Sequence, residues 1–466
     1  MSVRWQTIVA LMLASLLAGC GGDTSKARFA ENSALAKQLL PKARKAVQKT
    51  LDDHFGSPLD SVAWLKLPVN YGKAEGTVKT VDGQKLSVEF NAEASDLESL
   101  ASPELTRAGL LFTSGSNAGK QVLLAKFDSK NSTFETLPGL ESAPSSGDQF
   151  VAAGHFLRHG RKLYARHCQH CHGVSGDGEG TTAKYLNPRP RDYRLGVFKF
   201  TSTASFPAPI KATRDDLKRV IALGIPGTYM PSFVPMLKEN ELTAVIEYVR
   251  WLAMRGEIEK GLVTELKGEY SKDRSKDDGI DKSLETYLSE TYPNFVNEIA
   301  GEVGEKWSGA EEEGTPIIPK KPRPQDTAES RHRGKELFLG NKAKCVNCHG
   351  PTGRGNGPMT EDFQKNPDTN ETYAERGLYD TWGQPIKPRD LTRGIYRGGR
   401  RPIDIYRRIY AGIKGTPMPG NSQALSEDEI WDLVNYALSV PYDSQAPKSP
   451  KPHSVAEHSM DHGHAN

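Results

Sequence analysis

The 466-residue chain has few cysteines and no strong excess of charge of either sign. Four of its five cysteines lie in two short motifs and the fifth is Cys20, so no thiol is left for a structural disulfide. The apolar run at residues 8–17 is too short for a comfortable membrane span. A net charge of +3, with 26% charged and 36% hydrophobic residues, is typical of a soluble globular protein and gives no general attraction to nucleic acid.

The two cysteine motifs are copies of one pentapeptide, Cys168-x-x-Cys171-His172 and Cys345-x-x-Cys348-His349. This C-x-x-C-H spacing is the attachment signature of c-type haem. Two thiols three residues apart can both reach the vinyl groups of one porphyrin, and the adjacent imidazole then lies under the iron as an axial ligand. The alternatives are a C-x-x-C redox pair or half of a zinc site, although a zinc ribbon needs a second C-x-x-C close by. The sequence therefore predicts two covalently bound haems c.

The N-terminal segment has the order of an export signal: Arg4, the apolar run, and then Leu17-Ala18-Gly19-Cys20. The last four residues resemble a bacterial lipobox, in which the cysteine becomes the lipidated first residue of the mature protein. We expect a lipoprotein signal peptide over 1–20, a polar tether over 21–34, and a protein held at a membrane of the bacterial cell envelope, facing the periplasm. An ordinary signal peptide cut elsewhere and a short membrane anchor are the alternatives. Export agrees with the two motifs, because c-type haem is joined to protein outside the cytoplasm.

Internal repetition extends around both motifs. Gly160-x-x-Leu163-Tyr164 precedes the first and Gly334-x-x-Leu337-Phe338 precedes the second, and each predicts an amphipathic helix leading into the motif. Pro-Arg-Asp follows at 190–192 and at 388–390, and Gly-Ile-x-Gly-Thr-x-Met-Pro follows at 224–231 and at 412–419. Apolar positions with a helical period then predict a closing helix in each repeat, at Leu242, Val245, Tyr248, Val249 and Leu252, and at Ile430, Leu433, Val434 and Ala437.

Each repeat resembles a class I cytochrome c domain: an N-terminal helix, C-x-x-C-H, a loop ending in methionine, and a C-terminal helix crossing the first. The resemblance covers residues 155–255 and 332–441, roughly half of the chain. It implies a mainly α fold with two tandem cytochrome c domains, with His172 and His349 as axial ligands of the two irons.

The sixth iron ligand is expected to be methionine in both repeats. Thioether sulfur binds haem iron and raises the reduction potential relative to a second histidine. Met230 and Met418 both precede proline and follow Gly-Thr-x, in a turn-forming loop that can present sulfur to iron. Core packing is the ordinary role of methionine, and Met236 is the local rival of Met230. Met359 lies close in sequence to its own haem motif.

Arg191 and Arg389 are candidates for contact with haem propionates, because a guanidinium can fork onto a carboxylate. The alternative is a surface arginine paired with the neighbouring aspartate.

The remaining segments carry weaker signals. Residues 35–148 are expected to form a small α+β domain, from a helix period over 35–51, a hairpin around Asp82-Gly83 and a strand near 122–127. Lys and Arg exceed Asp and Glu by 8 over 155–255 and by 3 over 332–441, whereas 256–330 is acidic by 8. We expect 256–330 to be a partly helical linker with a stiff Pro-rich end at 316–324.

The C-terminal tail, residues 442–466, has four histidines after residue 450 and the composition of a disordered segment.

The predicted function is that of a dihaem c-type cytochrome carrying single electrons. The resemblance implies redox protein partners, such as a quinol-oxidising complex and a terminal oxidase or reductase, without a small-molecule substrate or nucleic acid. A dihaem cytochrome c peroxidase is the enzymatic alternative; it requires a displaceable ligand and acid–base groups beside one haem, and the sequence places no histidine or glutamate for that work. A redox-sensing or assembly subunit is the third class.

Overall fold

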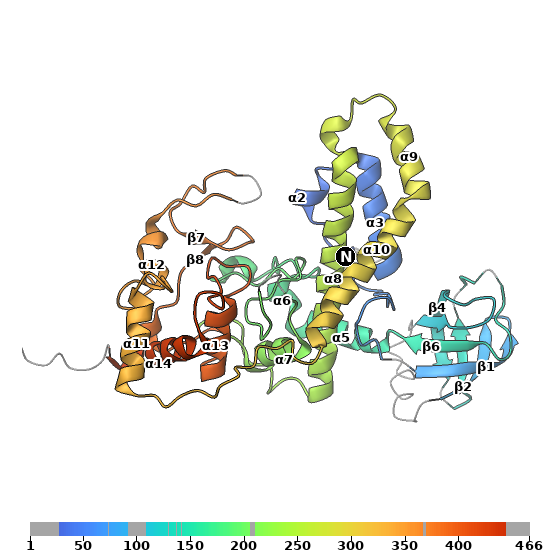
Figure 1. The fold of residues 1–466 in the computed structure, drawn as a ribbon. Helices are drawn as coiled ribbons and strands as arrows, with labels where there is room; N and C mark the ends of the chain where they lie inside the picture. Colours follow the sequence, from blue (N-terminus) through green and yellow to red (C-terminus); the bar gives the residue numbers. More distant parts are fainter. Residues whose placement is uncertain are drawn as a thin grey trace, which may run out of the picture.

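The computed structural model describes residues 28–443, except 73, 92–108, 129, 137, 141, 206–209 and 367–369. The expected signal peptide, Cys20 and all of the predicted tail except residues 442 and 443, which end a helix, lie outside the described residues. From one end to the other, the described chain forms a β-barrel, a first haem-motif domain with a helical stalk rising from it, and a second haem-motif domain (Figure 1). None of the helices in this part of the chain combines the length and apolar character needed to cross a membrane.

Each haem-motif domain is built on one pair of packed helices. In the first, α5 (His155–His167) packs against α8 (Glu239–Tyr270), and in the second, α11 (Ala328–Leu339) packs against α14 (Glu427–Asp443). The predicted apolar positions of the two closing helices are all buried. The shorter elements of these domains are α6 (Gln169–His172), α7 (Arg214–Leu223), α12 (Val346–His349) and α13 (Pro402–Ala411), with 3₁₀ turns at Ala183–Tyr185, Pro358–Glu361 and Leu391–Arg393. The mainly helical architecture expected for the two repeats is confirmed.

A glycine at the same repeat position lets each helix pair approach closely. A Cβ on Gly160 would lie 2.1 Å from the carbonyl oxygen of Ala244 in α8, and a Cβ on Gly334 would lie 2.1 Å from the carbonyl oxygen of Asp432 in α14. Backbone atoms cannot yield as a flexible side chain does. The repeated glycine therefore sets the distance between the helices that flank each haem motif.

Gly160→Ala is expected to lower the free energy of unfolding by about 1–3 kcal/mol, because the added methyl group overpacks this helix contact. Gly268→Ala, on the exposed part of α8 with no atom within 4 Å of the new Cβ, is the matched control. The control should gain up to about 1 kcal/mol from helix propensity. Thermal denaturation of both variants measures the difference, and equal melting temperatures would contradict the close contact.

The strands between residues 74 and 153 form a closed barrel, in the order β1-β2-β5-β4-β3-β6. The strands are β1 (Ala74–Asp82), β2 (Lys85–Phe90), β3 (Gly109–Phe112), β4 (Gln121–Asp128), β5 (Thr133–Thr136) and β6 (Gln149–Ala153). Neighbouring strands are antiparallel, with Val81 opposite Leu86 across the expected hairpin. Phe112, Phe134 and Phe150 fill a core separate from that of the helices.

The structure corrects the expected α+β domain over 35–148. The predicted helix exists as α3 (Pro41–Phe55), preceded by the single turn α2 (Ser33–Ala36), but its buried residues Val47, Leu51 and Phe55 belong to the core of the first haem-motif domain. Only the strands form a unit of their own, and they continue to residue 153. The amphipathic period of 35–51 showed that one face is buried but not which partner buries it.

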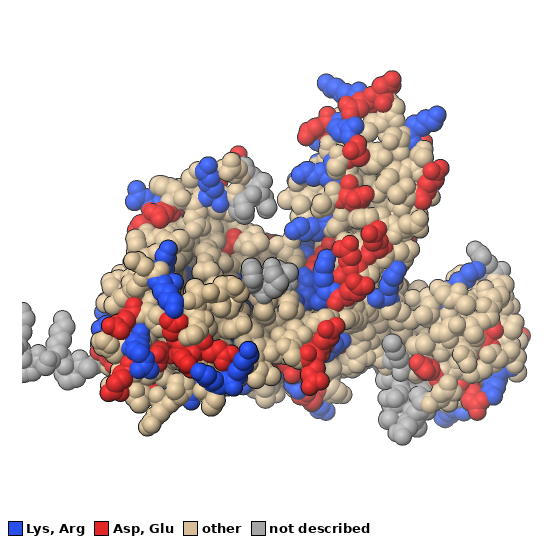
Figure 2. Space-filling view, viewed as in Figure 1, with Lys and Arg blue, Asp and Glu red and all other residues tan. Residues whose placement is uncertain are grey.

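The segment 256–330, expected to be a partly helical linker, is largely helical and packs against the first haem-motif domain. α8 runs through residue 255 without interruption to Tyr270, and α9 (Ile280–Glu290) and α10 (Tyr292–Ser308) fold back as the stalk (Figure 1). Two 3₁₀ turns, Lys272–Arg274 and Gly309–Glu311, complete this segment. Val303 and Trp307 of α10 are buried in the core of the first haem-motif domain. Figure 2 shows acidic and basic side chains intermixed along the stalk. One ion pair of this region joins Lys42 of α3 to Glu285 of α9, with 2.7 Å between the charged atoms.

The Pro-rich segment 316–324 is held against both haem-motif domains. The Ile317 amide donates to the Ser202 carbonyl oxygen at 2.7 Å, the Lys320 amide donates to the Glu427 carboxylate at 3.0 Å, and the Trp431 indole donates to the Lys321 carbonyl oxygen at 3.3 Å. The segment is therefore fixed at both ends, which favours one arrangement of the two domains.

Candidate haem sites

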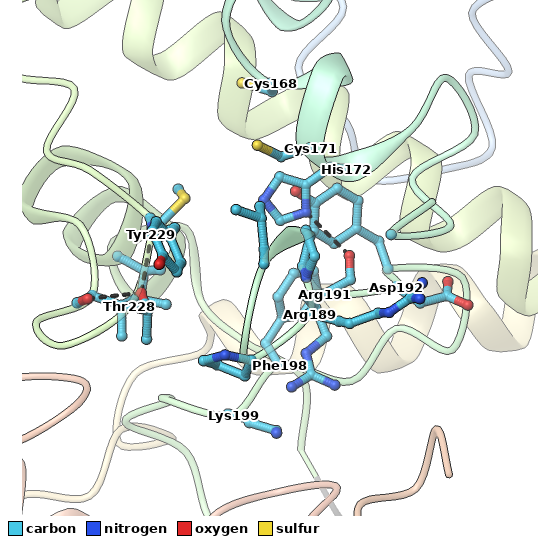
Figure 3. A pocket seen from close by; sticks show the side chains of 18 of the residues that line it. Cys168, Cys171, His172, Arg189, Arg191, Asp192, Phe198, Lys199, Thr228 and Tyr229 are labelled. Atoms are coloured by element: carbon cyan, nitrogen blue, oxygen red, sulfur yellow. Dashed lines mark hydrogen bonds between the residues drawn. The ribbon is translucent and has the colours of Figure 1, made fainter. Parts of the chain in front are cut away.

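The first cysteine motif forms a single helical turn at the wall of a cavity. The His172 amide donates to the Cys168 carbonyl oxygen at 2.9 Å, which brings both cysteines and the histidine to one side of the turn. The cavity has a volume of about 740 Å³ and is lined by Cys168, Cys171, His172 and Met230. Figure 3 shows the Cys171 sulfur and the His172 ring on one side of this space, and Thr228 and Tyr229 across from them. The structure thus brings together the four residues predicted for the first haem, two for covalent attachment and two as iron ligands.

Both motif histidines have one ring nitrogen fixed by a backbone carbonyl. His172 Nδ1 donates to the Arg191 carbonyl oxygen at 3.1 Å, drawn as a dashed line in Figure 3, and His349 Nδ1 donates to the Arg389 carbonyl oxygen at 3.2 Å. Burial lowers the pKa of His172 to about 4 and also lowers the pKa of His349. Each imidazole is therefore neutral at neutral pH, and its Nε2 is left free of a proton to bind iron.

The first thiol of each motif is kept protonated by its surroundings. Burial raises the pKa of Cys168 to about 12 and that of Cys345 to about 11. A zinc site would need thiolates and further ligands. Over residues 28–443, where the structure describes the chain, no group of three or more His, Cys, Asp or Glu side chains is placed to hold a metal ion. A zinc site at either motif would therefore lack its remaining ligands among these residues.

The two methionine loops have the same hydrogen bonds. The Ile225 amide donates to the Met230 carbonyl oxygen at 3.0 Å, and the Ile413 amide donates to the Met418 carbonyl oxygen at 3.1 Å. The Met230 amide donates to the hydroxyl of Thr228, two residues earlier, and the Met418 amide donates to that of Thr416. These contacts explain the repeated Gly-Ile-x-Gly-Thr-x-Met pattern as one rigid loop used twice.

A left-handed glycine begins each methionine loop. Gly224 and Gly412 have φ of +70° and +77°, and a Cβ at either position would lie 2.6 Å from the carbonyl oxygen of the loop methionine. Any other residue would be strained there and would collide with the loop.

The other methionines are placed as follows. Met236 is 47% exposed and also lines the first cavity, so it stays the local rival of Met230. Met254 is buried in the helix core. Met359 lies beside its own motif, with its sulfur 3.7 Å from Cys348 Sγ. Met418 lines a cavity of about 380 Å³ at the junction of the domains, and His349 is not among the residues lining it. The pairing of Met418 with His349 therefore rests on the matching loop geometry.

The two candidate propionate arginines are not equivalent. Arg191 lines the first cavity, and burial lowers the pKa of its guanidinium to about 10. Arg389 uses Nε to donate to the Ile395 carbonyl oxygen at 3.0 Å, and its guanidinium lies next to Gly227 in the methionine loop of the first domain. The half-buried Arg191 suits a carboxylate partner from haem, whereas Arg389 faces the other domain.

The first site also contains residues that the sequence did not single out. Asp380, Trp382 and Arg397, all from the second domain, line the first cavity. In the sequence, only the length of one segment could have indicated this contact. The stretch from Gly357 to Pro388 is 21 residues longer than the equivalent stretch from Gly180 to Pro190. The extra residues include the short hairpin β7 (Leu378–Tyr379) and β8 (Pro385–Ile386).

The residues of the first cavity fit haem c. The cavity offers two thiols and a neutral imidazole on one side, a thioether in its wall, and the half-buried cation Arg191. The Nε of Arg397 and the Nε1 of Trp382 are buried donors for which the described residues supply no acceptor. Haem propionates are acceptors of the required charge.

Comparison with known proteins agrees with this chemistry. The cytochrome c family model matches residues 157–253 and again residues 332–441. The search of curated proteins finds no match. Among solved structures, a chain of the Kuenenia stuttgartiensis reducing HAO-like protein complex is 26% identical, with 60% of this chain and 95% of that chain covered and a TM-score of 0.41. Cytochrome c domains imply covalently bound haem c and haem-based electron transfer. Residues 157–253 and 332–441 therefore form two tandem regions that match the cytochrome c family.

Proposed function

We propose that this protein is an electron carrier with two covalently bound haems c, one at Cys168 and Cys171 and one at Cys345 and Cys348. The observation that carries the proposal is the repeated methionine loop, which has the same glycines, threonine hydroxyl bonds and carbonyl contacts in both domains. His172 and Met230 would hold one haem iron, and His349 and Met418 would hold the other. These ligands would leave no open position for a substrate at either iron.

The protein residues hold the ligands and adjust the potential. Haem c supplies a one-electron couple at iron. The carbonyl oxygens of Arg191 and Arg389 orient the two imidazoles through Nδ1. Rigid loops keep the thioether sulfurs in place, and sulfur ligation favours the ferrous state relative to histidine.

The proposed partners are redox proteins of the cell envelope: a quinol-oxidising complex as donor and a terminal oxidase or reductase as acceptor. Electron transfer between proteins needs a haem edge near a surface on which a partner can dock. At the rim of the first cavity, Tyr229 is 66% exposed and Met236 is 47% exposed. Apolar side chains at such a rim support docking of a partner there.

A dihaem peroxidase is the competing function. Contrary to the expectation from the sequence, histidine and glutamate do line the first cavity, as His167, His170 and Glu179. Glu179 is ion-paired with Arg189 at 2.9 Å, and His170 belongs to the turn of the motif itself. Because these groups lie at the site, a measurement of whether the haem iron binds an external ligand is needed to distinguish a carrier from a peroxidase.

Absorption spectra of the purified protein in both oxidation states distinguish the carrier from the peroxidase. A carrier with methionine on both irons should show the weak red-end band of sulfur-ligated ferric haem, and its reduced form should not change on addition of carbon monoxide. Rapid carbon monoxide binding by one or both haems would mean that an iron has an open or weak site, and the peroxidase function would then be favoured.

We further propose that Cys20 is lipidated and holds the protein at a membrane facing the periplasm. The support is the lipobox-like sequence ending at the one cysteine outside the haem motifs. Several acyl chains together anchor firmly where a single chain is marginal, so the mature protein should stay with membranes after a high-salt wash.

Cys20→Ser should release the protein from membranes or stop its processing. Fractionation and immunoblotting of cells that produce either form measure this. Retention of the variant equal to that of the wild type would show that docking to a membrane protein, rather than lipid, holds the chain.

A further inference from the structure

The hairpin that the second domain adds to its repeat reaches the haem cavity of the first domain. Asp380 lies on this hairpin with a side chain that is only 5% exposed. Its carboxylate is 3.0 Å from Lys199 Nζ and 3.9 Å from the Arg191 guanidinium, and both of these cations belong to the first domain. Trp382, two residues on, stacks on Arg191, with the guanidinium carbon 3.6 Å from the ring centroid.

The hairpin is held rigidly in this position. Asp380 Oδ1 accepts hydrogen bonds from the amides of Trp382 at 3.1 Å and Gln384 at 3.0 Å. The Thr381 amide donates to the carbonyl oxygen of Gly415, in the methionine loop of the second domain, at 3.1 Å. A Cβ on Gly415 would lie 2.6 Å from the Trp382 ring. Trp382 is thus fixed between the methionine loop of its own domain and Arg191 of the other.

Two donors of the second domain remain unsatisfied at this cavity. Trp382 Nε1 and Arg397 Nε are buried without an acceptor, and both residues line the first cavity. A buried donor without an acceptor costs about 1–3 kcal/mol, so such groups are normally paired. Burial lowers the pKa of Lys199 to about 8, which shows that this cation also has less anionic compensation than its burial demands.

We propose that the second domain completes the first haem site, with Trp382 Nε1 and Arg397 Nε donating to the propionates of the first haem. Asp380 is a positioning residue, which holds Arg191 and Lys199 at the same carboxylates. The only anionic groups of haem are its propionates, and they supply the acceptors that the described residues lack. This inference rests on the proposed attachment of haem at Cys168 and Cys171.

The test is a pair of variants with opposite expected effects on the potential of the first haem. Trp382→Phe keeps an aromatic ring but removes the N–H donor, which leaves more negative charge on the propionate and favours ferric iron. Asp380→Asn removes a negative charge near the same haem and favours ferrous iron. We expect a lower potential in the first and a higher one in the second. The ferric–ferrous equilibrium should change by two- to tenfold, up to about 59 mV for one electron.

Two control variants change residues of the same hairpin and of the longer stretch 357–388 that contains it. Tyr379→Phe removes a hydroxyl that donates to the Glu375 carbonyl oxygen, and Asp362→Asn removes an exposed carboxylate. Spectroelectrochemical titration in a Met418→His background separates the two haem waves. Resonance Raman spectra of the propionate bending band report the hydrogen bond itself.

The expected result is a shifted propionate band in Trp382→Phe, opposite shifts of the first wave in Trp382→Phe and Asp380→Asn, and no shift in either control. An unchanged band and wave in both test variants would overturn the proposal and show that water satisfies Trp382 and Arg397. If the wild-type protein carries no haem at Cys168 and Cys171, the proposed function itself fails, and this outcome is visible before any variant is made.

Discussion

Met418→His should lower the midpoint potential of the second haem by a few tenths of a volt, a substantial part of the ~0.8 V range that axial ligands span. Imidazole donates more strongly than thioether and favours ferric iron. Haem should stay attached, because the thioether bonds to Cys345 and Cys348 do not depend on the sixth ligand. Spectroelectrochemical titration measures the potential, and the sulfur band of the ferric spectrum reports the ligand.

Met359→Leu is the matched control for this experiment. Its sulfur lies 3.7 Å from Cys348 Sγ, beside the attachment motif, so it should not hold the iron and its loss should leave the potential nearly unchanged. If Met418→His left the potential and the full sulfur band intact while Met359→Leu removed the part of the band that belongs to the second haem, the assignment of Met418 would be wrong. Met230→His should lower the potential of the first haem in the same way.

Replacing Cys168 and Cys171 together with alanine should remove one covalently bound haem and leave the other. The second domain has a core of its own, in which Phe338, Tyr406 and Trp431 are buried, and its attachment motif shares no residue with the first. Intact mass under denaturing conditions counts the haems directly. The reciprocal pair, Cys345→Ala with Cys348→Ala, is the control and should leave the first haem attached.

Loss of both haems in either double variant would contradict independent attachment. Independent attachment does not mean independent potentials, because Asp380 and Trp382 of the second domain lie at the first site. The stability of the two variants should also differ. Cys168 lies in the large core that joins the first domain to α3 and the stalk, so its loss should lower the melting temperature more than loss of Cys345.

The sequence predicted what depends on short-range pattern. The helix pairs follow from apolar periods, and the two glycines that let them approach were visible as a repeat at Gly160 and Gly334. The methionine loops were predicted because Gly-Ile-x-Gly-Thr-x-Met-Pro occurs twice in the sequence. The structure adds the reason for the first glycine of each copy: Gly224 and Gly412 have backbone that only glycine adopts easily. These features need no knowledge of distant partners.

What the sequence did not predict depends on long-range partners. The net charge changes from positive to negative after residue 255, which indicated a domain boundary there. Helix α8 nevertheless continues through this point, because Arg255 is buried and paired with Glu259 in the next turn. Strands of four or five residues, such as β3 and β5, are too short for alternation to be seen. The contact of Asp380 with Lys199 joins residues 181 positions apart, and no periodicity specifies such a pair.

A reductive titration of the purified protein counts the electrons that it takes up and follows both haems at once. A two-haem carrier should show two reversible one-electron steps per chain, the same ligand spectrum before and after a full cycle, and no consumption of hydrogen peroxide by the reduced protein. Uptake of only one electron, or steady oxidation of the reduced protein by hydrogen peroxide with turnover, would contradict a carrier with two six-coordinate haems.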